Sequence, residues 1–423
     1  MPPNELVLDA ATRQLAGPLV VTETVGGHAI AVSLADSSTT RRMVLGVETP
    51  LVGREGELAT LRAQLRRALD DEEREIVVVT GPSGIGKSRL VSEIRGDLER
   101  EAALVLEGRA AAAVRRAPAG LIAEAIARGA GVRAGQPTGE QWRALRQFLS
   151  RHASGLDDDD VTFLGVAIGL EAKDSLQLQA AKADPKLMQE HVSGALVAFL
   201  ERAAERGPVA VWLEDLHWEH PPNLPLFSRV LEALDESPVF VVATARDELF
   251  EAHPGLFDEL EPTRIALKPL GKRGVRRLAA AILQGEVSSE LEASIRKWSD
   301  GNPYLLEEFL SWLVSRDAVI AKTAEWVFTQ APEALGLPVT LEAALQGRID
   351  ALGAERKEIL KIAAVFGTSV WDAGIQALRP RPPPRIWPAW SRRTSWSPRR
   401  TRASSAPASG RSGTTRCSAW PTG

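Results

Sequence analysis

Residues 76–89 read Ile-Val-Val-Val-Thr-Gly-Pro-Ser-Gly-Ile-Gly-Lys-Ser-Arg, an order of residues that indicates the fold class. Its apolar, β-branched start is typical of a buried parallel strand, and a helical pattern follows from Arg89 to Arg100. Between them, glycines let backbone N–H groups converge on phosphate oxygens, and the helix N-terminus adds partial positive charge. The order predicts a P-loop in which Lys87 binds the β and γ phosphates and Ser88 ligates magnesium. The predicted nucleotide-binding residues here are Gly81, Pro82, Ser83, Gly84, Ile85, Gly86, Lys87, Ser88 and Arg89.

A second apolar run, Val209 to Leu213, ends in two carboxylates, Glu214 and Asp215. A P-loop needs acidic groups from a neighbouring strand to hold the metal and to polarise water, and this run has the shape of such a Walker B element. By position we expect Glu214 on the magnesium side with Ser88, and Asp215 beside the attacking water. The sequence alone leaves these two catalytic and metal-binding roles interchangeable.

A third apolar run, Pro238 to Thr244, continues as Ala-Arg-Asp. A polar or cationic side chain at the end of such a strand can sense the γ-phosphate, so Arg246 or Thr244 is the predicted sensor. The alternative is a surface arginine without a catalytic role. Farther on, Ser299 to Tyr304 reads Ser-Asp-Gly-Asn-Pro-Tyr, a turn in which Pro303 opens a helix.

Apolar runs alternate with helical patterns at residues 119–130, 139–152 and 186–206, which predicts an α/β fold. We expect a P-loop NTPase domain with a parallel sheet flanked by helices, in which the three apolar runs are neighbours. Residues 272–314 are almost all helical in pattern and predict an all-helical lid. The predicted units are an upstream remnant at 1–45, the ATPase domain at 46–270, the lid at 271–336, a further helical unit at 337–378 and a basic tail at 379–423.

Composition narrows the class of protein. The tail from Arg379 carries ten arginines and no acidic residue, which leaves 41 basic and 55 acidic side chains in residues 1–378. A body this acidic argues against broad nucleic-acid binding by the folded part. The chain has one cysteine, no run of eighteen apolar residues and no leader pattern, so we interpret it as cytoplasmic, without a disulfide framework or a membrane partner. We interpret the close pair His217 and His220 as surface-loop residues rather than metal ligands.

Together these motifs resemble the ATPase module of STAND regulators, the signal transduction ATPases with numerous domains, an AAA-type and origin-recognition-like group. The likeness is closest to large bacterial proteins that join this module to a serine/threonine kinase or nucleotide cyclase domain and to tetratricopeptide repeats. The resemblance implies ATP or ADP with Mg²⁺, a lid followed by a winged-helix-like unit, contact of Pro303 with adenine, and a nucleotide-set inactive or active conformation; it also allows a homo-oligomer. The segments that carry it are LGVETPLVGREGEL (45–58), GPSGIGKSRL (81–90), VWLEDLHWEHPP (211–222), ATARDE (243–248), SDGNPYLLEEFL (299–310), LPVTLEAALQGRIDAL (337–352) and AAVFGTSVW (363–371).

The chain departs from this pattern in three places. The family usually has Asp two residues after the tryptophan of the LHW segment, where this chain has His220. No kinase catalytic loop, cyclase metal site or repeat array is present. Residues 389–423 lack Leu, Val, Asp and Glu, a composition that cannot pack a core, and we hypothesise a frameshift near Arg379; a basic arm that binds nucleic acid or membrane is the alternative.

The leading hypothesis is an ATP-dependent conformational switch with slow hydrolysis. A DNA-associated, origin-recognition-like or transcription-regulating ATPase is the alternative, because a helical unit follows residue 337. A small-molecule phosphotransferase is less favoured, since a lid follows the P-loop domain rather than a second substrate site. A truncated product that binds nucleotide and signals to nothing is the fourth hypothesis.

Overall fold

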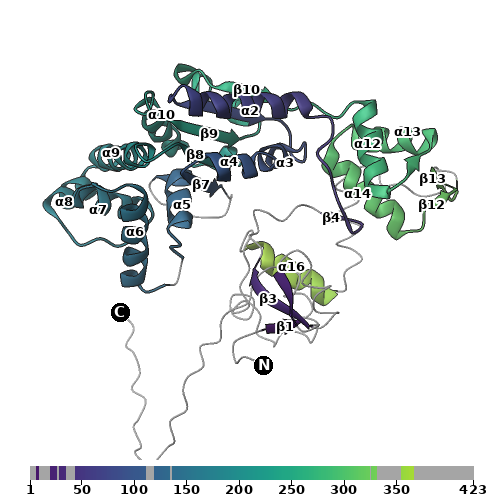
Figure 1. Cartoon of the computed structure of the whole chain (residues 1–423), viewed down its shortest axis with the longest axis horizontal. Coiled ribbons are helices and arrows are strands. Elements are labelled where there is room, and N and C mark those ends of the chain that lie inside the picture. Colours follow the sequence, from purple (N-terminus) through teal and green to yellow (C-terminus); the bar gives the residue numbers. More distant parts are fainter. Residues whose placement is uncertain are drawn as a thin grey trace, which may run out of the picture. The chain divides into compact units, whose positions relative to one another are not determined.

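The computed structural model describes residues 6–8, 20–25, 28–34, 43–110, 119–133, 136–323, 325–330 and 354–365 (Figure 1). The chain divides into two compact units, Met1–Thr40 with Gln376–Gly423, and Arg41–Ile375. The first unit contains an antiparallel sheet of order β1-β3-β2. Its strands are β1 (Leu6–Leu8), β2 (Val20–Val25) and β3 (His28–Leu34).

The second unit is built on a five-stranded, all-parallel sheet of order β10-β6-β9-β8-β7. The three apolar runs of the sequence form β6, β9 and β8, which are adjacent, so the prediction that they are neighbours is confirmed. The edge strands β7 and β10 were missed, because LVLEGR and TRIA are short and mix apolar with charged residues. The strands are β6 (Glu75–Thr80), β7 (Leu104–Arg109), β8 (Val209–Glu214), β9 (Val239–Thr244) and β10 (Thr263–Ala266).

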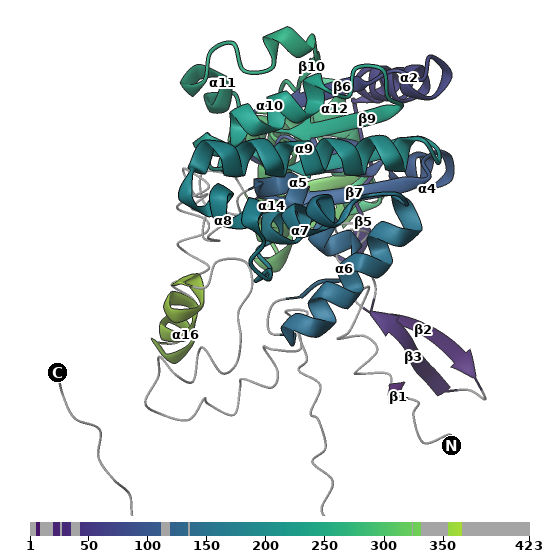
Figure 2. The same cartoon turned by 90° about the vertical axis from the view of Figure 1, so that its left-hand side faces the viewer.

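Alternate residues of these strands face two separate hydrophobic cores, as the two-residue period of a strand requires. Val77 and Val79 of β6 pack with the helices of one face, and Ile76 and Val78 pack with those of the other. Figure 2 shows α9 lying across the second of these faces. The first face is covered by α2 (Glu55–Asp70), α3 (Lys87–Ser92) and α4 (Arg95–Glu101), and the second by α5 (Gly120–Gly129), α9 (Pro185–Ala204) and α10 (Leu224–Glu232).

Helices also separate β7 from β8 in the chain. The patterns at 119–130, 139–152 and 186–206 correspond to α5, α6 and α9, whereas α7 and α8 were not predicted. Asp157 and Asp160 form a capping box at the start of α7, and Asp184 caps α9 just before Pro185. The helix expected from Arg89 to Arg100 is interrupted at residues 93–94, so it becomes α3 and α4. The added helices are α6 (Thr138–His152), α7 (Asp158–Ala167) and α8 (Leu176–Ala183).

The elements from Lys272 to Phe328 follow the sheet domain in the chain and have their own core, and we use the name lid for them. Three helices pack around Leu291, Leu306 and Phe309, and Val44 and Val52 from the segment before α2 join this core. The lid also holds a small sheet of order β11-β13-β12, which the helical pattern of residues 271–336 did not predict. Its elements are α12 (Lys272–Leu283), β11 (Glu286–Val287), α13 (Ser289–Ser299), α14 (Pro303–Ser315), β12 (Val319–Lys322) and β13 (Glu325–Phe328).

Of the unit expected at 337–378, the described part is helix α16 (Ala354–Val365). The rest of that unit and the tail from residue 379 lie outside the described residues. Among the residues that are described, no helix is long and apolar enough to cross a membrane.

Candidate nucleotide site

The carboxyl ends of β6, β8 and β9 meet at one edge of the sheet. Val79 of β6 pairs with Thr244 of β9, and Leu213 of β8 pairs with Ala243 of β9. Ligands of open α/β sheets bind outside this edge. The structure therefore brings together the P-loop, the carboxylates of Glu214 and Asp215 at the end of β8, and the segment of Arg246.

The P-loop connects β6 to α3, and Gly86, in a left-handed conformation with φ of 104°, precedes the first helical residue, Lys87. The Lys87 side chain is buried, and its Nζ donates hydrogen bonds to the carbonyl oxygens of Gly81 at 2.8 Å and Pro82 at 3.0 Å. Burial lowers the pKa of Lys87, and the nearby Asp215 carboxylate opposes that shift. The ammonium is thus held inside the loop, close to the Walker B aspartate.

Glu214 is the last residue of β8 and contacts the predicted metal ligand of the P-loop. Burial raises the pKa of Glu214, while Arg109 and a hydrogen bond with Ser88 act in the opposite direction. Carboxylate and hydroxyl oxygens are the donors that a hard cation such as Mg²⁺ accepts. Ser88 and Glu214 therefore fit the magnesium side of a nucleotide site.

Asp215 leaves the strand in a left-handed conformation, with φ of 58°. Its backbone N–H donates to the Thr244 hydroxyl at 3.0 Å, and Thr244 is fully buried. This conformation costs energy for a non-glycine residue, and it persists only where the surrounding structure holds the residue in place. The Thr244 hydroxyl therefore supports the turn at Asp215. Of the two residues predicted as γ-phosphate sensors, Arg246 lines the cavity of the site and Thr244 does not.

Arg109 is a site residue that the sequence did not reveal. Its Nε lies 3.4 Å from Glu214 Oε2 and 3.6 Å from Asp215 Oδ2, so one guanidinium spans both carboxylates. Arg109 ends β7, and β7 is next to β8 in the sheet. The sequence analysis did not predict β7, so it could not place Arg109 at the end of a strand beside Glu214.

Arg246 follows β9 and stacks on an aromatic side chain. Its Cζ lies 5.5 Å from the ring centroid of Trp218, which is 44% exposed and lines the same cavity.

His217 contacts Trp218 at a centroid distance of 5.2 Å, and both ring nitrogens of His217 are buried. Burial lowers the pKa of His217, and the Arg246 charge adds to that shift. The interpretation of His217 as a surface-loop residue is therefore wrong: η2 (Leu216–Trp218) turns its ring inward. His220 is exposed.

The P-loop and the lid line one cavity of about 390 Å³. Arg89 reaches it from α3, where its Nη2 donates to the Thr49 carbonyl at 3.3 Å, and Pro303 reaches it from the first turn of α14. A cavity of this volume can receive a small ligand between the strand ends and the lid. Its lining includes Thr49, Pro50, Leu51, Val52, Arg54, Ser83, Gly84, Ile85, Gly86, Lys87, Ser88, Arg89, Arg109, Asp215, Trp218, Arg246, Leu270, Leu278, Pro303, Tyr304 and Glu307.

Glu219 has a structural role that the sequence did not reveal. This buried carboxylate accepts hydrogen bonds from the backbone N–H groups of Leu121 at 2.7 Å and His220 at 2.7 Å, and from Asn223 Nδ2 at 3.0 Å. It thereby ties the segment after the Walker B strand to the first turn of α5. A buried carboxylate with several donors is a positioning group for the backbone around it.

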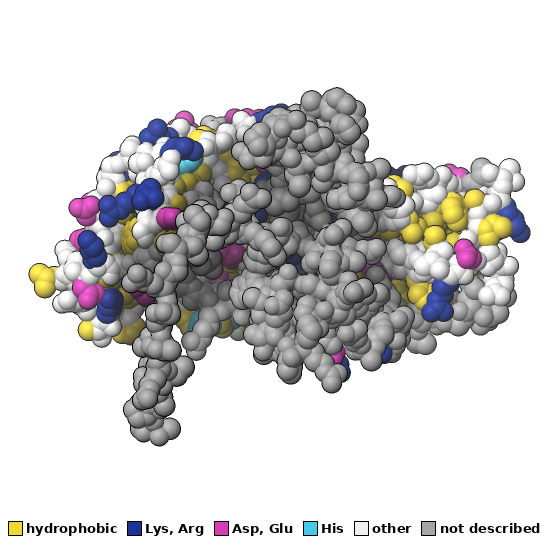
Figure 3. Space-filling model, turned by 90° about the horizontal axis from the view of Figure 1, so that it is seen from below, with side chains coloured by type: hydrophobic (Ala, Val, Ile, Leu, Met, Phe, Trp, Pro, Cys, Tyr) yellow, Lys and Arg dark blue, Asp and Glu magenta, His cyan; other side chains and the backbone are white. Residues whose placement is uncertain are grey.

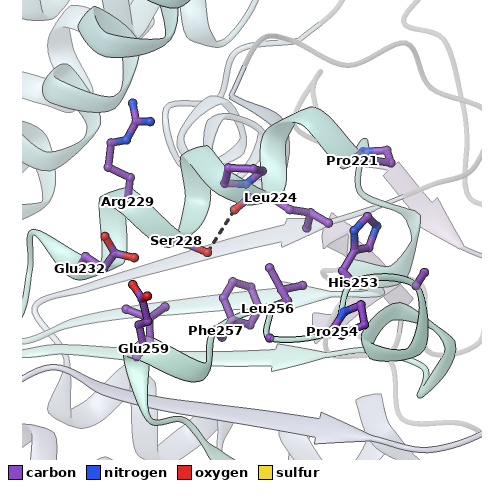
Figure 4. Close-up of a pocket in the computed structure, with 14 residues that line it drawn as sticks. Pro221, Leu224, Ser228, Arg229, Glu232, His253, Pro254, Leu256, Phe257 and Glu259 are labelled. Carbon is purple, nitrogen blue, oxygen red and sulfur yellow. Dashed lines mark hydrogen bonds between the residues drawn. The ribbon is translucent and has the colours of Figure 1, made fainter.

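A larger hollow, of about 660 Å³, lies away from the P-loop (Figure 4). Leu224 and Ser228 of α10 form one side, and His253, Leu256 and Phe257 form the other. No residue predicted for nucleotide or metal binding lines it. Most of the side chains predicted to bind the nucleotide line the smaller cavity at the strand ends and not this larger one.

Residues 50–242 match the family model of the AAA ATPase domain. This region of the chain is thus similar to an AAA ATPase domain. The match includes the P-loop and the Walker B strand, and this family implies nucleotide binding, with magnesium as the usual metal.

An uncharacterized protein of Rhizobium meliloti (strain 1021) is 28% identical over 392 residues, which are 89% of this chain and 36% of that protein. The chain thus spans about a third of the length of that relative.

Among solved structures, the chain is similar to the Aeropyrum pernix Orc1 protein in complex with DNA, at 17% identity and a TM-score of 0.40, over 79% of this chain and 78% of that one. It is also similar to Cdc6p from Pyrobaculum aerophilum, at 14% identity and a TM-score of 0.40, over 92% and 89% of the two chains. For the Thermotoga maritima RuvB Holliday junction branch migration motor, the identity is 14% and the TM-score 0.34, over 77% of this chain and 82% of that one.

Proposed function

We propose that this chain is a nucleotide-dependent switch, in which the AAA ATPase domain binds ATP with magnesium, hydrolyses it slowly and sets the position of the lid. One observation carries the proposal. The cavity at the P-loop is lined by the strand ends on one side and by Leu278, Pro303 and Tyr304 of the lid on the other. A ligand shifts a conformational equilibrium only when it contacts the two states differently, and a nucleotide in this cavity would touch both moving parts.

Each predicted side chain has a role in this proposal. Lys87 and the backbone N–H groups of the P-loop, other than that of Pro82, which has none, hold the phosphates, and Pro303 lies against the base. Asp215 orients the attacking water, because its side chain lines the cavity near Lys87. Arg246 reads the γ-phosphate from the end of β9, and the Trp218 ring supports its guanidinium.

The residues present fit a magnesium ion. The Ser88 hydroxyl lies near enough to the Glu214 carboxylate to oppose the rise in its pKa, and Asp215 adds a second carboxylate within reach of the same Arg109 guanidinium. Because the Arg109 guanidinium lies beside both carboxylates, Glu214 and Asp215 place their negative charges close together. When bound, magnesium would neutralise charge on the phosphate oxygens.

Hydrolysis and lid movement can be tested together on the full chain. Phosphate release should be slow and magnesium-dependent, and hydrogen exchange of the α14 amides should differ between the ATP-loaded and ADP-loaded protein. Equal exchange with both nucleotides, each bound at saturation, would leave an ATPase without the switch. Absence of binding for both nucleotides would end the proposal altogether.

We further propose that the module works in bacterial regulators linked to a kinase or cyclase domain and to repeats, with self-association in the ATP state. The support is the resemblance of the motifs and the length of the relative, of which the chain covers 36%. Sequencing the gene on both sides of the coding region checks this: an open reading frame without such domains would contradict it. Light scattering with ATP and with ADP checks self-association.

A DNA-associated ATPase is the alternative, because the sequence predicts a further helical unit after the lid. On the face shown in Figure 3, basic and acidic side chains of the described residues lie interspersed rather than in one basic patch. Phosphate contacts need clustered Lys and Arg. Salt-dependent DNA binding that survives deletion of residues 379–423 would favour this alternative over the switch.

A further inference from the structure

Three successive carbonyl oxygens of the P-loop accept hydrogen bonds from groups outside the loop. Asn302 Nδ2 donates to Ser83 O at 2.9 Å, the Tyr304 backbone N–H donates to Gly84 O at 3.2 Å, and Arg54 Nη2 donates to Ile85 O at 3.3 Å. Two of these donors belong to the start of α14 in the lid, far from the P-loop in sequence. The third belongs to the residue just before α2.

The turn that supplies the lid donors is itself firmly held. Asn302 Oδ1 caps α14 by accepting from the backbone N–H groups of Tyr304 at 3.0 Å and Leu305 at 3.4 Å. The Leu270 N–H donates to the carbonyl of Gly301 at 2.8 Å, which ties the turn to the end of the sheet domain. One side chain, Asn302, thus caps the helix with its oxygen and holds the P-loop with its nitrogen.

The contact between turn and loop is close. Gly84 has a φ of +77°, and a Cβ at this position would lie 2.7 Å from the Tyr304 Cβ and 2.9 Å from Asn302 Oδ1. Only glycine adopts this conformation without strain and lets the lid approach so near. Gly84, a variable position of the P-loop pattern, is therefore a glycine partly because any larger residue would clash with Asn302 and Tyr304 of the lid.

Peptide geometry links these bonds to phosphate binding. No peptide bond among the described residues is cis, and in a trans peptide the C=O and the following N–H point in opposite directions. Donors that fix the carbonyls of residues 83, 84 and 85 from outside therefore turn the N–H groups of residues 84, 85 and 86 the other way. The Ile85 N–H is also engaged within the loop, with Pro82 O at 3.4 Å, so the effect concerns Gly84 and Gly86 most.

We propose that Asn302, together with the Tyr304 amide and Arg54, orients the phosphate-binding amides of the P-loop, so that the docked lid is part of the anion site. Asn302 is then a positioning residue, which acts on the phosphates through the loop. The proposal rests on the nucleotide binding proposed above and adds its consequence: phosphates favour the docked lid, and undocking weakens the hold on the phosphates by the same factor.

The test uses the full chain and two variants of the lid. Asn302→Ser keeps a neutral capping oxygen for α14 and removes the donor to Ser83, because serine is as good a cap but too short to reach the loop. Ser288→Ala is the matched control: Ser288 Oγ accepts from the Leu291 N–H at 3.3 Å and caps α13 in the same lid, without a contact to the P-loop. Affinities for ADP and for adenosine are measured by competition with a fluorescent ADP analogue.

We expect Asn302→Ser to weaken ADP about tenfold, the loss of one oriented hydrogen-bonding group, and to leave adenosine unchanged. Ser288→Ala should change neither affinity. Unchanged ADP affinity in Asn302→Ser overturns the proposal, as does an equal loss for ADP and adenosine, since that would mean a general effect of the lid. If the unmodified chain binds neither ADP nor ATP, the proposed function itself is wrong. A result that concerns Asn302→Ser alone bears only on the role of Asn302.

Discussion

The edge of the parallel sheet and the lid line the same cavity, yet they are built in different ways. At the sheet edge, charged side chains such as Lys87 and Asp215 follow strands whose apolar residues are fully buried. The lid has a separate core around Leu306 and Phe309 and meets the P-loop through hydrogen bonds to its backbone. The sheet edge supplies the charges, and the lid sets the geometry in which the backbone amides act.

This difference predicts that the two regions fail differently when they are damaged. A weakened sheet core should unfold the whole domain, because the P-loop and the segments of Asp215 and Arg246 all follow its strands. A weakened lid should leave the sheet folded and reduce nucleotide affinity, because two of the three outside donors to the carbonyls of residues 83–85 are lost. Substitutions in each region test that contrast.

Leu306→Ala should destabilise the lid by about 2–5 kcal/mol, because a fully buried leucine in the lid core leaves a cavity. Hydrogen exchange should rise in α12 to α14 while β6, β8 and β9 stay protected. Leu98→Ala, an equally buried change in the core beneath the sheet, is the counterpart and should loosen the strands as well. Equal loss of protection in both regions for both variants would remove the distinction between them.

Lys87→Ala should abolish measurable ATP binding, a loss of at least about 100-fold, because the charged donor to the phosphates is removed. Isothermal titration of ATP measures it. Lys297→Ala, an exposed lysine of α13 in the lid, is the control and should bind normally. An ATP affinity that survives in Lys87→Ala would refute the assignment of the P-loop.

Asp215→Asn should lower kcat by about 100-fold and leave the dissociation constant of ATP within a few-fold, since the amide cannot polarise water as the carboxylate does. Single-turnover hydrolysis separates the two quantities. If affinity falls and the rate constant does not, Asp215 holds the metal and Glu214 is the better candidate for orienting water.

Glu214→Gln should slightly stabilise the nucleotide-free protein at neutral pH, by no more than about 1 kcal/mol. Burial raises the pKa of Glu214 above its ordinary 4.5, so the charged carboxylate costs stability once the pH exceeds the folded-state pKa. Below 4.5 the carboxyl is protonated in both states, and the variant and the parent protein should converge. Thermal unfolding from pH 4 to 8 checks this, with Glu232→Gln, an exposed glutamate of α10, as the control. A variant that is less stable than the parent at pH 7 would contradict the burial argument.

The sequence predicted the central strands and the P-loop because those segments carry their own signal. Four successive apolar residues precede Thr80 and five precede Glu214, and such runs indicate buried strands. The glycine spacing of residues 81–88 is typical of a loop whose backbone N–H groups bind phosphate. Arg109 escaped prediction because its role depends on β7 lying beside β8. His217 was misread because nothing local to it indicates that η2 turns the ring inward.

Local patterns are enough to specify an α/β P-loop domain whose charged motifs follow strand ends, because apolar runs and glycine spacing are properties of short segments. Which side chains share a site depends on tertiary contacts. Arg109 comes from a neighbouring strand, and Asn302 and Tyr304 come from the lid, and all three meet the site only after the chain has folded. Contacts between segments far apart in the chain depend on sheet order and on the docking of one core against another, which no single stretch of sequence encodes.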